Sequence, residues 1–460
     1  MDTGFIDNER IFSYLRSARP PDARETADIL AKARQLKGLD PAEAARLLLL
    51  EDTDSLQELF AASLFAKSEI YGKRLVLFAP LYVSNLCNNE CLYCAFRKSN
   101  DRITRRTLSQ DEIRSETELL VDQGHKRVLL VSGEGLGEAA LGYSLKAIET
   151  IYGVQRGNGE IRRININIAA LPVDAYRQLK QARVGTYQLF QETYHYDTFR
   201  RMHPQGPKAD YLYHLTAMDR AMQGGIDDVG VGILFGLYDY RFEVLAMLQH
   251  IRHLEETFGV GCHTISLPRI EPATGSDLSL HPPHAVSDGD FRKIIAVLRL
   301  TVPYTGMILS TRENARMRRE AFSLGISQIS AGSRTNPGGY SSRESGEQFS
   351  LGDHRNLEDV ITDIVGHGYI PSFCTGCYRL GRTGSDFMDL AKPGLIKLFC
   401  LPNAMTSFKE YLVHYASAPT RAAGEELIGR MLSDIPDEKT REATKANLAS
   451  IETGARDLYL

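Results

Sequence analysis

The sequence predicts an α/β fold, a TIM-type (β/α)8 barrel, from the order, number and spacing of its short apolar runs. From Arg74 onward these runs alternate with helical or loop segments, the pattern of a parallel sheet with helical crossovers. Eight runs follow one another, which is the strand number of such a barrel. They are 75–83, 127–131, 161–169, 185–190, 228–234, 263–267, 306–309 and 328–331. A doubly wound open sheet is the second choice.

Two further regions flank this predicted barrel, which we place at residues 71–340. Residues 1–70 are expected to form a helical extension, because Ile11, Tyr14 and Leu15 have helical spacing and Pro41 suits the first turn of a helix. Residues 341–460 follow a polar stretch with Gly and Ser and are expected to form a separate, mainly helical domain.

Charge and composition exclude several classes of protein. The chain of 460 residues has 54 basic and 58 acidic side chains, a net charge of −4, so nucleic acid is not an expected partner. The most apolar stretch, residues 44–50, is far too short to cross a membrane. No signal peptide opens the sequence, so we expect a cytoplasmic protein. In a reducing compartment, its seven cysteines are expected to bind metal or act in catalysis rather than form disulfides.

Cys87, Cys91 and Cys94 directly follow the first predicted strand, with the spacing C-x-x-x-C-x-x-C. Three thiolates on one loop can hold three irons of a 4Fe-4S cluster and leave the fourth iron open for another ligand. A structural zinc site needs four ligands, and no His or fourth Cys lies within fifteen residues. The motif therefore predicts a cluster with one open iron.

This motif resembles that of the radical S-adenosylmethionine (SAM) superfamily, in which SAM binds the open iron. Tyr93 matches the aromatic residue that usually precedes the third cysteine. Ser132, Gly133 and Glu134 match the turn that contacts the SAM amino group, although Ser132 replaces a glycine. The segment from Gly232 to Gly236 is similar to the element beside the adenine. Each glycine motif alone is weak, because ordinary turns also use glycine.

A second triplet, Cys374, Cys377 and Cys400, lies in the C-terminal region. A second 4Fe-4S cluster is preferred, but zinc competes, because a C-x-x-C pair is a common half of a zinc site. Cys262 precedes His263 at the start of the sixth strand, far from the SAM end of the barrel. His263 is therefore expected either to be a hydrogen-bonded core residue or to bind metal at the second triplet.

Across nearly its whole length the chain resembles the tyrosine-cleaving radical SAM lyases, and among them the branch that matures FeFe-hydrogenase. The matching segments are 78–82, 124–127, 185–188, 191–195, 203–208, 237–243, 308–313 and 379–384. This resemblance implies cleavage of L-tyrosine to p-cresol and dehydroglycine, and conversion of the latter to CO and cyanide bound to iron for H-cluster assembly. It also implies that His263 holds a labile fifth iron at the second cluster.

The resemblance further implies partners for this activity. They are free cysteine and iron at the second cluster, an electron donor such as ferredoxin or flavodoxin, and other hydrogenase maturation proteins. Two alternatives stay open. A 2-iminoacetate synthase-like lyase of thiamine biosynthesis shares the barrel but lacks Cys374, Cys377 and Cys400, and an iron-sulfur carrier or scaffold would perform no radical chemistry.

Several polar residues are candidates for the substrate and cofactor sites. The carboxylate of tyrosine needs a cation, and Arg312 is preferred to Arg269, with a surface ion pair as the alternative for both. Gln191 and Glu192 are candidates for contacts with SAM. Glu90, like Ser132, departs from the family and is expected to alter SAM affinity or cluster potential.

The barrel interior is expected to contain a passage, because the two cysteine triplets are predicted at opposite ends of a fold that is usually a packed core. Asn165 and Asn167 alternate with isoleucines, so both side chains point to the same face of their strand. If that face is inward, they line a polar route; otherwise they make buried hydrogen bonds to neighbouring structure.

Overall fold

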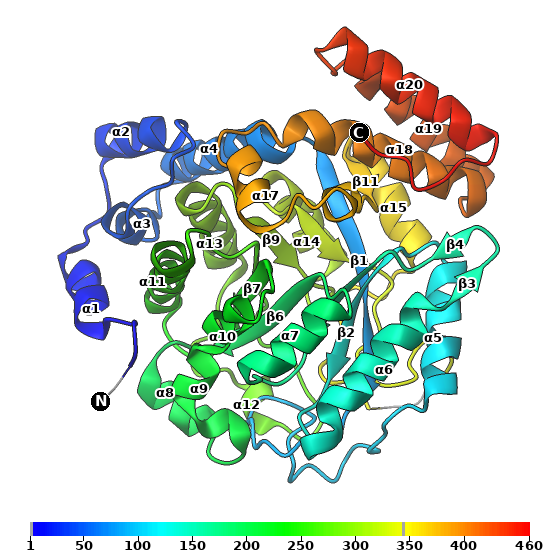
Figure 1. Cartoon of the computed structure of the whole chain (residues 1–460). Helices are drawn as coiled ribbons and strands as arrows, with labels where there is room; N and C mark the ends of the chain where they lie inside the picture. Colours follow the sequence, from blue (N-terminus) through cyan, green and yellow to red (C-terminus); the bar gives the residue numbers. More distant parts are fainter. Residues whose placement is uncertain (1–2, 343–345) are drawn as a thin grey trace.

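The barrel is closed. The computed structural model describes residues 3–342 and 346–460 (Figure 1), and eight parallel strands follow one another around the barrel in chain order. The strands are β1 (Arg74–Ser84), β2 (Arg127–Ser132), β5 (Arg163–Asn167), β6 (Thr186–Glu192), β7 (Asp228–Ile233), β8 (Thr264–Ser266), β9 (Gly306–Leu309) and β10 (Gln328–Ser330). β10 pairs with β1, with Val76 opposite Gln328. The eight predicted strands are confirmed, and the open sheet is wrong.

Helices cover the outside of the barrel between consecutive strands. They are α5 (Gln110–Asp122), α6 (Ala140–Tyr152), α7 (Val173–Gln181), α8 (Tyr196–Met202), α9 (Tyr211–Leu215), α10 (Ala217–Gln223), α11 (Tyr240–Phe258), α12 (Asp277–Leu280), α13 (Asp288–Thr301), α14 (Ala315–Ser323) and α15 (Leu357–Gly366). Local sequence explains their starts: Ser109 accepts from the backbone N–H of Glu112, whose side chain accepts in return from the N–H of Ser109. The last helix of the barrel, α15, comes after residue 340.

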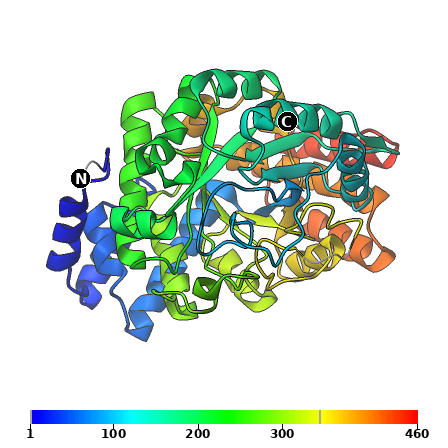
Figure 2. The ribbon, with the colours of Figure 1, turned by 90° about the horizontal axis from the view of Figure 1, so that it is seen from below.

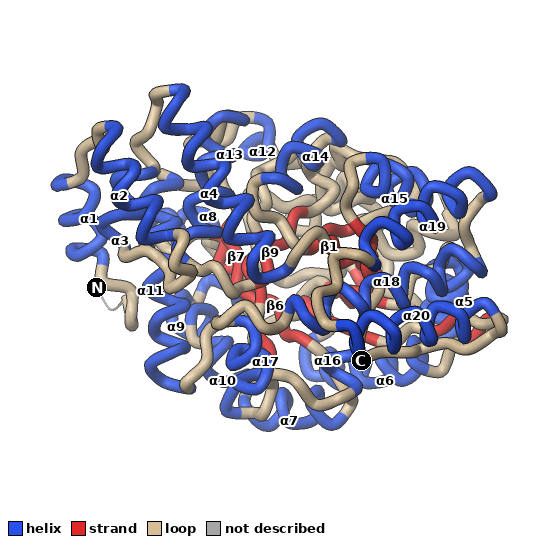
Figure 3. The backbone as a smooth tube through the Cα atoms, turned by 90° about the horizontal axis from the view of Figure 1, so that it is seen from above, coloured by secondary structure: helices blue, strands red, loops and turns tan. Residues whose placement is uncertain are grey.

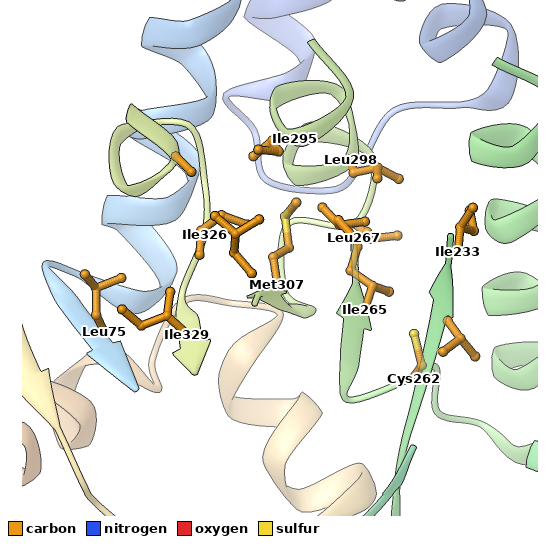
Figure 4. Close-up of a cluster of buried hydrophobic side chains, with 14 of the residues drawn as sticks. Leu75, Ile233, Cys262, Ile265, Leu267, Ile295, Leu298, Met307, Ile326 and Ile329 are labelled. Atoms are coloured by element: carbon orange, nitrogen blue, oxygen red, sulfur yellow. The ribbon is translucent and has the colours of Figure 1, made fainter. Parts of the chain in front are cut away.

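The main core lies between the strands and this helical layer. Ile265, Met307 and Ile329 project from the strands into the apolar cluster that also contains Ile295 and Leu298 of α13, and all five are buried (Figure 4). Burial of each such side chain stabilises the fold by about 1.5–3 kcal/mol. Cys262 belongs to the same apolar cluster. Because side chains alternate along a strand, the neighbouring residues face the barrel interior.

The chain ends add helices on two sides of the barrel. The N-terminal helices are α1 (Asn8–Ser17), α2 (Ala23–Ala33), α3 (Pro41–Leu47) and α4 (Thr53–Tyr71), which agrees with the predicted helical extension. The C-terminal elements are β11 (Ile370–Ser372), α16 (Gly376–Arg379), α17 (Gly384–Ala391), α18 (Lys397–His414), α19 (Ala418–Leu432) and α20 (Glu438–Glu452). β11 pairs with the first residues of β1, which places α16 and α17 over the amino ends of the strands (Figure 3).

A buried ion cluster joins the C-terminal helices to the barrel. Glu410 of α18 binds both Lys126 (2.6 Å) and Arg162 (2.7 Å), which lie just before β2 and β5. The two cations hold the pKa of Glu410 at about 2 despite its burial, which alone would raise it. Removal of the Glu410 carboxylate would leave the buried Lys126 cation without its counter-charge. None of the described helices is long and apolar enough to cross a membrane.

Candidate functional site

Two cavities lie at opposite ends of the barrel, and each is lined by one cysteine triplet. The first has a volume of about 190 Å³ and is lined by Cys87, Cys91, Cys94 and residues at the carboxyl ends of the strands. The second, of about 50 Å³, is lined by Cys374, Cys377, Cys400 and residues at the amino ends. Figure 2 shows the loops at the carboxyl end, and Figure 3 shows the C-terminal helices over the other. We call them the carboxyl-end and amino-end cavities.

One arginine holds the first cysteine loop in shape. The Arg105 guanidinium donates four hydrogen bonds to main-chain carbonyls on both sides of the triplet, those of Asn85 (2.8 Å), Phe96 (2.8 Å), Arg97 (2.5 Å) and Asn100 (3.0 Å). These carbonyls belong to a loop without regular secondary structure, so they need such partners. The sequence analysis missed this residue, although its position eleven residues after Cys94 within a basic stretch is a weak signal.

Glycines after β2 let a second loop pack against the first. A Cβ at Gly133 would lie 2.4 Å from the carbonyl oxygen of Leu86, and one at Gly135 would lie 2.4 Å from the carbonyl carbon of the same residue. Both positions therefore require glycine. Ser132 lines the cavity and donates a hydrogen bond to the Gly133 carbonyl (3.1 Å). Glu134 also lines it and accepts from the Asn89 side chain (2.6 Å).

The loop after β6 adds an acid and brings in a buried lysine. Glu192 lines the carboxyl-end cavity with φ +67, in the left-handed region. Such strain in a non-glycine residue persists only where the surroundings impose it. Lys208, which the sequence analysis missed, binds Glu192 (2.8 Å). Burial lowers the pKa of Lys208, but Glu192 and Cys91 together raise it above its usual value. Gln191 is buried and does not line the cavity.

The structure also places the remaining predicted residues of this end. Tyr93 lines the cavity, and its hydroxyl is 2.8 Å from His203 Nε2. Gly232 and Gly236 do not line it, whereas Leu234 between them does. Gly236 adopts φ +119, which favours glycine. Glu90 is paired with Arg97 (3.2 Å), so its charge is already neutralised.

The two candidate arginines differ sharply. Arg312 is in the wall of the carboxyl-end cavity, over the ring of Phe349, and its guanidinium has no ion pair or hydrogen bond within the described part of the chain. Burial lowers its pKa. Arg269 lies outside that wall and is bound by Glu313 (2.5 Å) and Asp288 (3.0 Å). Arg312 alone is thus available to an incoming carboxylate.

The second triplet comes together with His263. Cys374 and Cys377 lie around the start of α16 and Cys400 lies in α18, and all three line the amino-end cavity with His263. His263 Nε2 is 3.3 Å from the hydroxyl of Tyr378, and its Nδ1 is 3.4 Å from Asp228 Oδ1. His263 is thus a buried, hydrogen-bonded residue and also a neighbour of the three cysteines, which is compatible with both alternatives.

Basic residues surround this second triplet. Arg74, Arg127 and Arg163 open three neighbouring strands; Arg127 donates to the Cys374 carbonyl (2.9 Å), and Arg163 lies over the ring of Tyr378. The sequence analysis missed these arginines, although each is the first residue of its strand. The direction of the strands, from which His263 is placed at the amino end of the barrel, also predicts that position for the three arginines.

The donors of the two triplets are not gathered around single metal ions in the described part of the chain. Over residues 3–342 and 346–460, no three His, Cys, Asp or Glu side chains converge on one metal ion. A cluster does not require such convergence, because each thiolate binds a different iron. Burial raises the pKa of Cys94 to about 11 and of Cys377 to about 12, so metal binding must displace their protons.

Comparisons with known proteins agree with this geometry. The radical SAM superfamily model matches residues 81–251, and the biotin and thiamin synthesis associated domain matches residues 266–370. A crystal structure of HydG, a maturase of the [FeFe]-hydrogenase, is 51% identical and covers 100% of both chains with a TM-score of 0.96. HydG from Carboxydothermus hydrogenoformans is 39% identical over 97% of this chain and 99% of its own, with a TM-score of 0.85.

The chain is also similar to a second kind of radical SAM enzyme. The 2-iminoacetate synthase of Escherichia coli (strain K12) is 32% identical over 314 residues, 68% of this chain and 81% of its own. The radical SAM domain implies a 4Fe-4S cluster with SAM, and the carboxyl-end cavity offers three thiols and room beside them. The chain therefore belongs to the radical SAM superfamily and, within it, to the family of the [FeFe]-hydrogenase maturase HydG.

Proposed function

We propose that the protein is a radical SAM lyase that cleaves L-tyrosine to p-cresol and dehydroglycine, and converts the latter to CO and cyanide bound to iron for assembly of the FeFe-hydrogenase H-cluster. The observation that supports this most is the pair of cysteine-lined cavities at the two ends of one barrel. A 2-iminoacetate synthase-like lyase would need only the first, and a carrier would need no substrate cation such as Arg312.

The first reaction would take place in the carboxyl-end cavity. Cys87, Cys91 and Cys94 would hold the 4Fe-4S cluster, which together with bound SAM supplies a radical able to remove a hydrogen atom from the substrate. Glu134 and Glu192 have carboxylates in the cavity wall and would orient polar groups of SAM. Lys208 neutralises Glu192 and holds it beside the cysteines.

Tyrosine would bind through Arg312. Its guanidinium is half-buried in the cavity wall without a carboxylate partner in the described residues, a state that a substrate carboxylate would relieve with paired hydrogen bonds. The apolar walls formed by Phe78, Leu129 and Phe349 suit an aromatic side chain and exclude water. Arg269 is not assigned a substrate role, because Glu313 and Asp288 already neutralise it.

The second reaction would take place in the amino-end cavity. Cys374, Cys377 and Cys400 would hold a second 4Fe-4S cluster, and His263 would bind the labile fifth iron, which is cargo together with free cysteine. Burial lowers the pKa of His263, so the imidazole is neutral as a metal ligand requires. Zinc at this triplet is less favourable, since no three His, Cys, Asp or Glu side chains of the described residues converge on a single ion.

Dehydroglycine would travel through the barrel interior. Asn167 lines the carboxyl-end cavity, which shows that its face of β5 is inward, and Asn165 shares that face. Gln188, in the wall of the first cavity, is 3.4 Å from Thr264, and Gln328 lines the second cavity. These side chains form a polar layer between the cavities, along which a polar intermediate could pass.

One experiment separates the three functions. Anaerobically reconstituted protein is mixed with SAM, tyrosine and dithionite, and 5′-deoxyadenosine, p-cresol, glyoxylate and iron-bound CO are measured. All but glyoxylate are expected. Glyoxylate with p-cresol but no CO would favour the iminoacetate synthase, and absence of deoxyadenosine would favour a carrier. Ferredoxin or flavodoxin would replace dithionite in the cell, and other hydrogenase maturation proteins would receive the product.

A further inference from the structure

The last described residues of the chain lie beside the second cysteine triplet. Residues 455–460, which we call the strap, follow α20 and are half-buried without regular secondary structure. They leave the α19–α20 pair and return to α16 and α18, the two helices that bear the triplet. None of the strap residues lines the amino-end cavity, so the strap supports the site from outside.

On α18, the strap follows the helical face that begins with Cys400. Asn403 exchanges two hydrogen bonds with the main chain of Leu460 (2.7 and 3.3 Å), and the Thr406 hydroxyl donates to the Leu458 carbonyl (3.1 Å). Asn403 and Thr406 follow Cys400 at intervals of three residues, which places all three on one side of the helix. The strap therefore binds the side of α18 on which Cys400 lies.

On the other side, the strap binds the segment that contains Cys374 and Cys377. Arg382 donates to the main-chain oxygen of Leu460 (2.8 Å), and Arg379 pairs with Asp457 (3.0 Å). Tyr459 lies against Gly376, where an added Cβ would come within 3.1 Å of the tyrosine Cβ. Gly376 in turn donates its N–H to Cys374 Sγ (3.2 Å).

The two cysteine-bearing segments also contact each other directly, and the rings of Phe373 and Tyr411 stack with centroids 5.4 Å apart. Phe373 donates its N–H to the Ser407 hydroxyl (3.2 Å), and Arg382 lies over the ring of Phe399. The strap adds polar links on both sides, and Asp457 also reaches Arg162 at the base of the barrel (3.5 Å). Asp457 adopts φ +56, a conformation that a non-glycine residue keeps only when its surroundings impose it.

We propose that residues 455–460 are a positioning strap that holds Cys374 and Cys377 at the correct distance from Cys400, and so determines how well the amino-end cavity retains its metal. The strap neither touches the cavity nor contributes a ligand. It acts by tying the Cys374–Cys377 segment to α18 through Arg379 and Arg382 on one side and Asn403 and Thr406 on the other. This inference rests on the proposed metal site of the second triplet.

Two altered proteins test the strap. The first is the chain without residues 456–460; the second is the Arg379→Gln, Arg382→Gln double variant, which keeps the strap and its Tyr459–Gly376 contact but removes its two polar ties to the Cys374–Cys377 segment. Arg430→Gln is the matched control, because Arg430 pairs with Glu426 on the exposed surface of α19. Hydrogen exchange of residues 374–382 is measured without metal, and iron content and the electron paramagnetic resonance signals of both clusters are measured after reconstitution.

We expect exchange at residues 374–382 to become about tenfold faster in both altered proteins, since each loses at least two hydrogen-bonded ties. The signal of the second cluster should fall while that of the first, and deoxyadenosine formation, stay at the level of the control. Unchanged exchange and an intact second signal in the double variant would overturn the strap. Absence of the second signal in the unaltered chain would instead overturn the proposed metal site, and the exchange result would still decide the strap.

Discussion

The two cysteine sites are built in different ways. The first triplet lies on one short loop, which Arg105 holds through four carbonyls and which the glycines after β2 pack against. The second triplet is divided between α16 and α18, and it meets His263 only because β11 docks on β1. A site on one loop can be recognised from spacing alone, whereas an assembled site depends on tertiary contacts and is more easily disturbed.

The largest expected effect comes from removal of thiols, and it should separate the two sites completely. Cys91→Ala should abolish deoxyadenosine and p-cresol, because the first cluster loses a ligand. The Cys374→Ala, Cys377→Ala double variant should retain p-cresol and lose iron-bound CO, seen by infrared spectroscopy. Equal loss of p-cresol in both proteins would contradict the division of labour. Cys262→Ala is the control, since Cys262 is in the apolar core and lines neither cavity.

A large effect on the first site alone is expected from Arg312→Gln. Loss of the half-buried cation that faces the cavity should lower kcat/KM for tyrosine about 100-fold, mainly through KM, because a charged hydrogen bond to the carboxylate is lost. The signals of both clusters should be unchanged. Arg316→Gln, at an exposed ion pair with Asp288, serves as the control. An unchanged KM for tyrosine would remove Arg312 from the substrate site.

The connection between the sites can be tested with Asn167→Phe. The phenyl ring is larger than the asparagine side chain and should obstruct the polar layer of the interior. Formation of p-cresol should therefore continue, while the infrared bands of iron-bound CO and cyanide weaken. Asn167→Ala removes the same hydrogen bond to the Gln188 carbonyl (2.7 Å) without filling the space, and it should leave these bands strong. Unchanged bands in Asn167→Phe would exclude this route.

The smallest effect on turnover is expected from Arg105→Lys. This variant tests whether the first cysteine loop owes its stability to Arg105. A lysine cannot reproduce the fork that serves four carbonyls, so unfolding of the metal-free protein should become easier by about 1–3 kcal/mol. Denaturant titration measures this change, and iron retention at the first cluster should fall faster than at the second. If the denaturant midpoint of Arg105→Lys equals that of the unaltered protein, other contacts hold the loop.

Much of the fold was predictable because it depends on local patterns. The eight strands follow from apolar runs, and the inward face of Asn165 and Asn167 follows from alternation once one side chain is placed. The last barrel helix, α15, was assigned to the C-terminal region because the long segment after β10 looks like a boundary.

The sites were predictable to different degrees. The cysteines, His263 and Arg312 stand out by spacing or strand position. The roles of three other residues could not be inferred, because only the folded chain brings their partners near. Arg105 binds main-chain carbonyls, Lys208 binds Glu192, and Arg163 lies over the ring of Tyr378. Arg269 is a second candidate behind Arg312 in the sequence, which does not show that Glu313 and Asp288, from other segments, neutralise it.

Strand β1 has a consequence for the whole molecule. Its first residues pair with β11, two residues before Cys374, and its last residue, Ser84, lies three residues before Cys87 (Figure 1). One continuous strand therefore fixes the separation of the two cysteine triplets. At about 3.3 Å per residue it spans roughly 33 Å. The length of this single strand sets the separation of the two triplets, and so the length of the proposed route; any change in it by an odd number of residues would also reverse which side chains face the barrel interior.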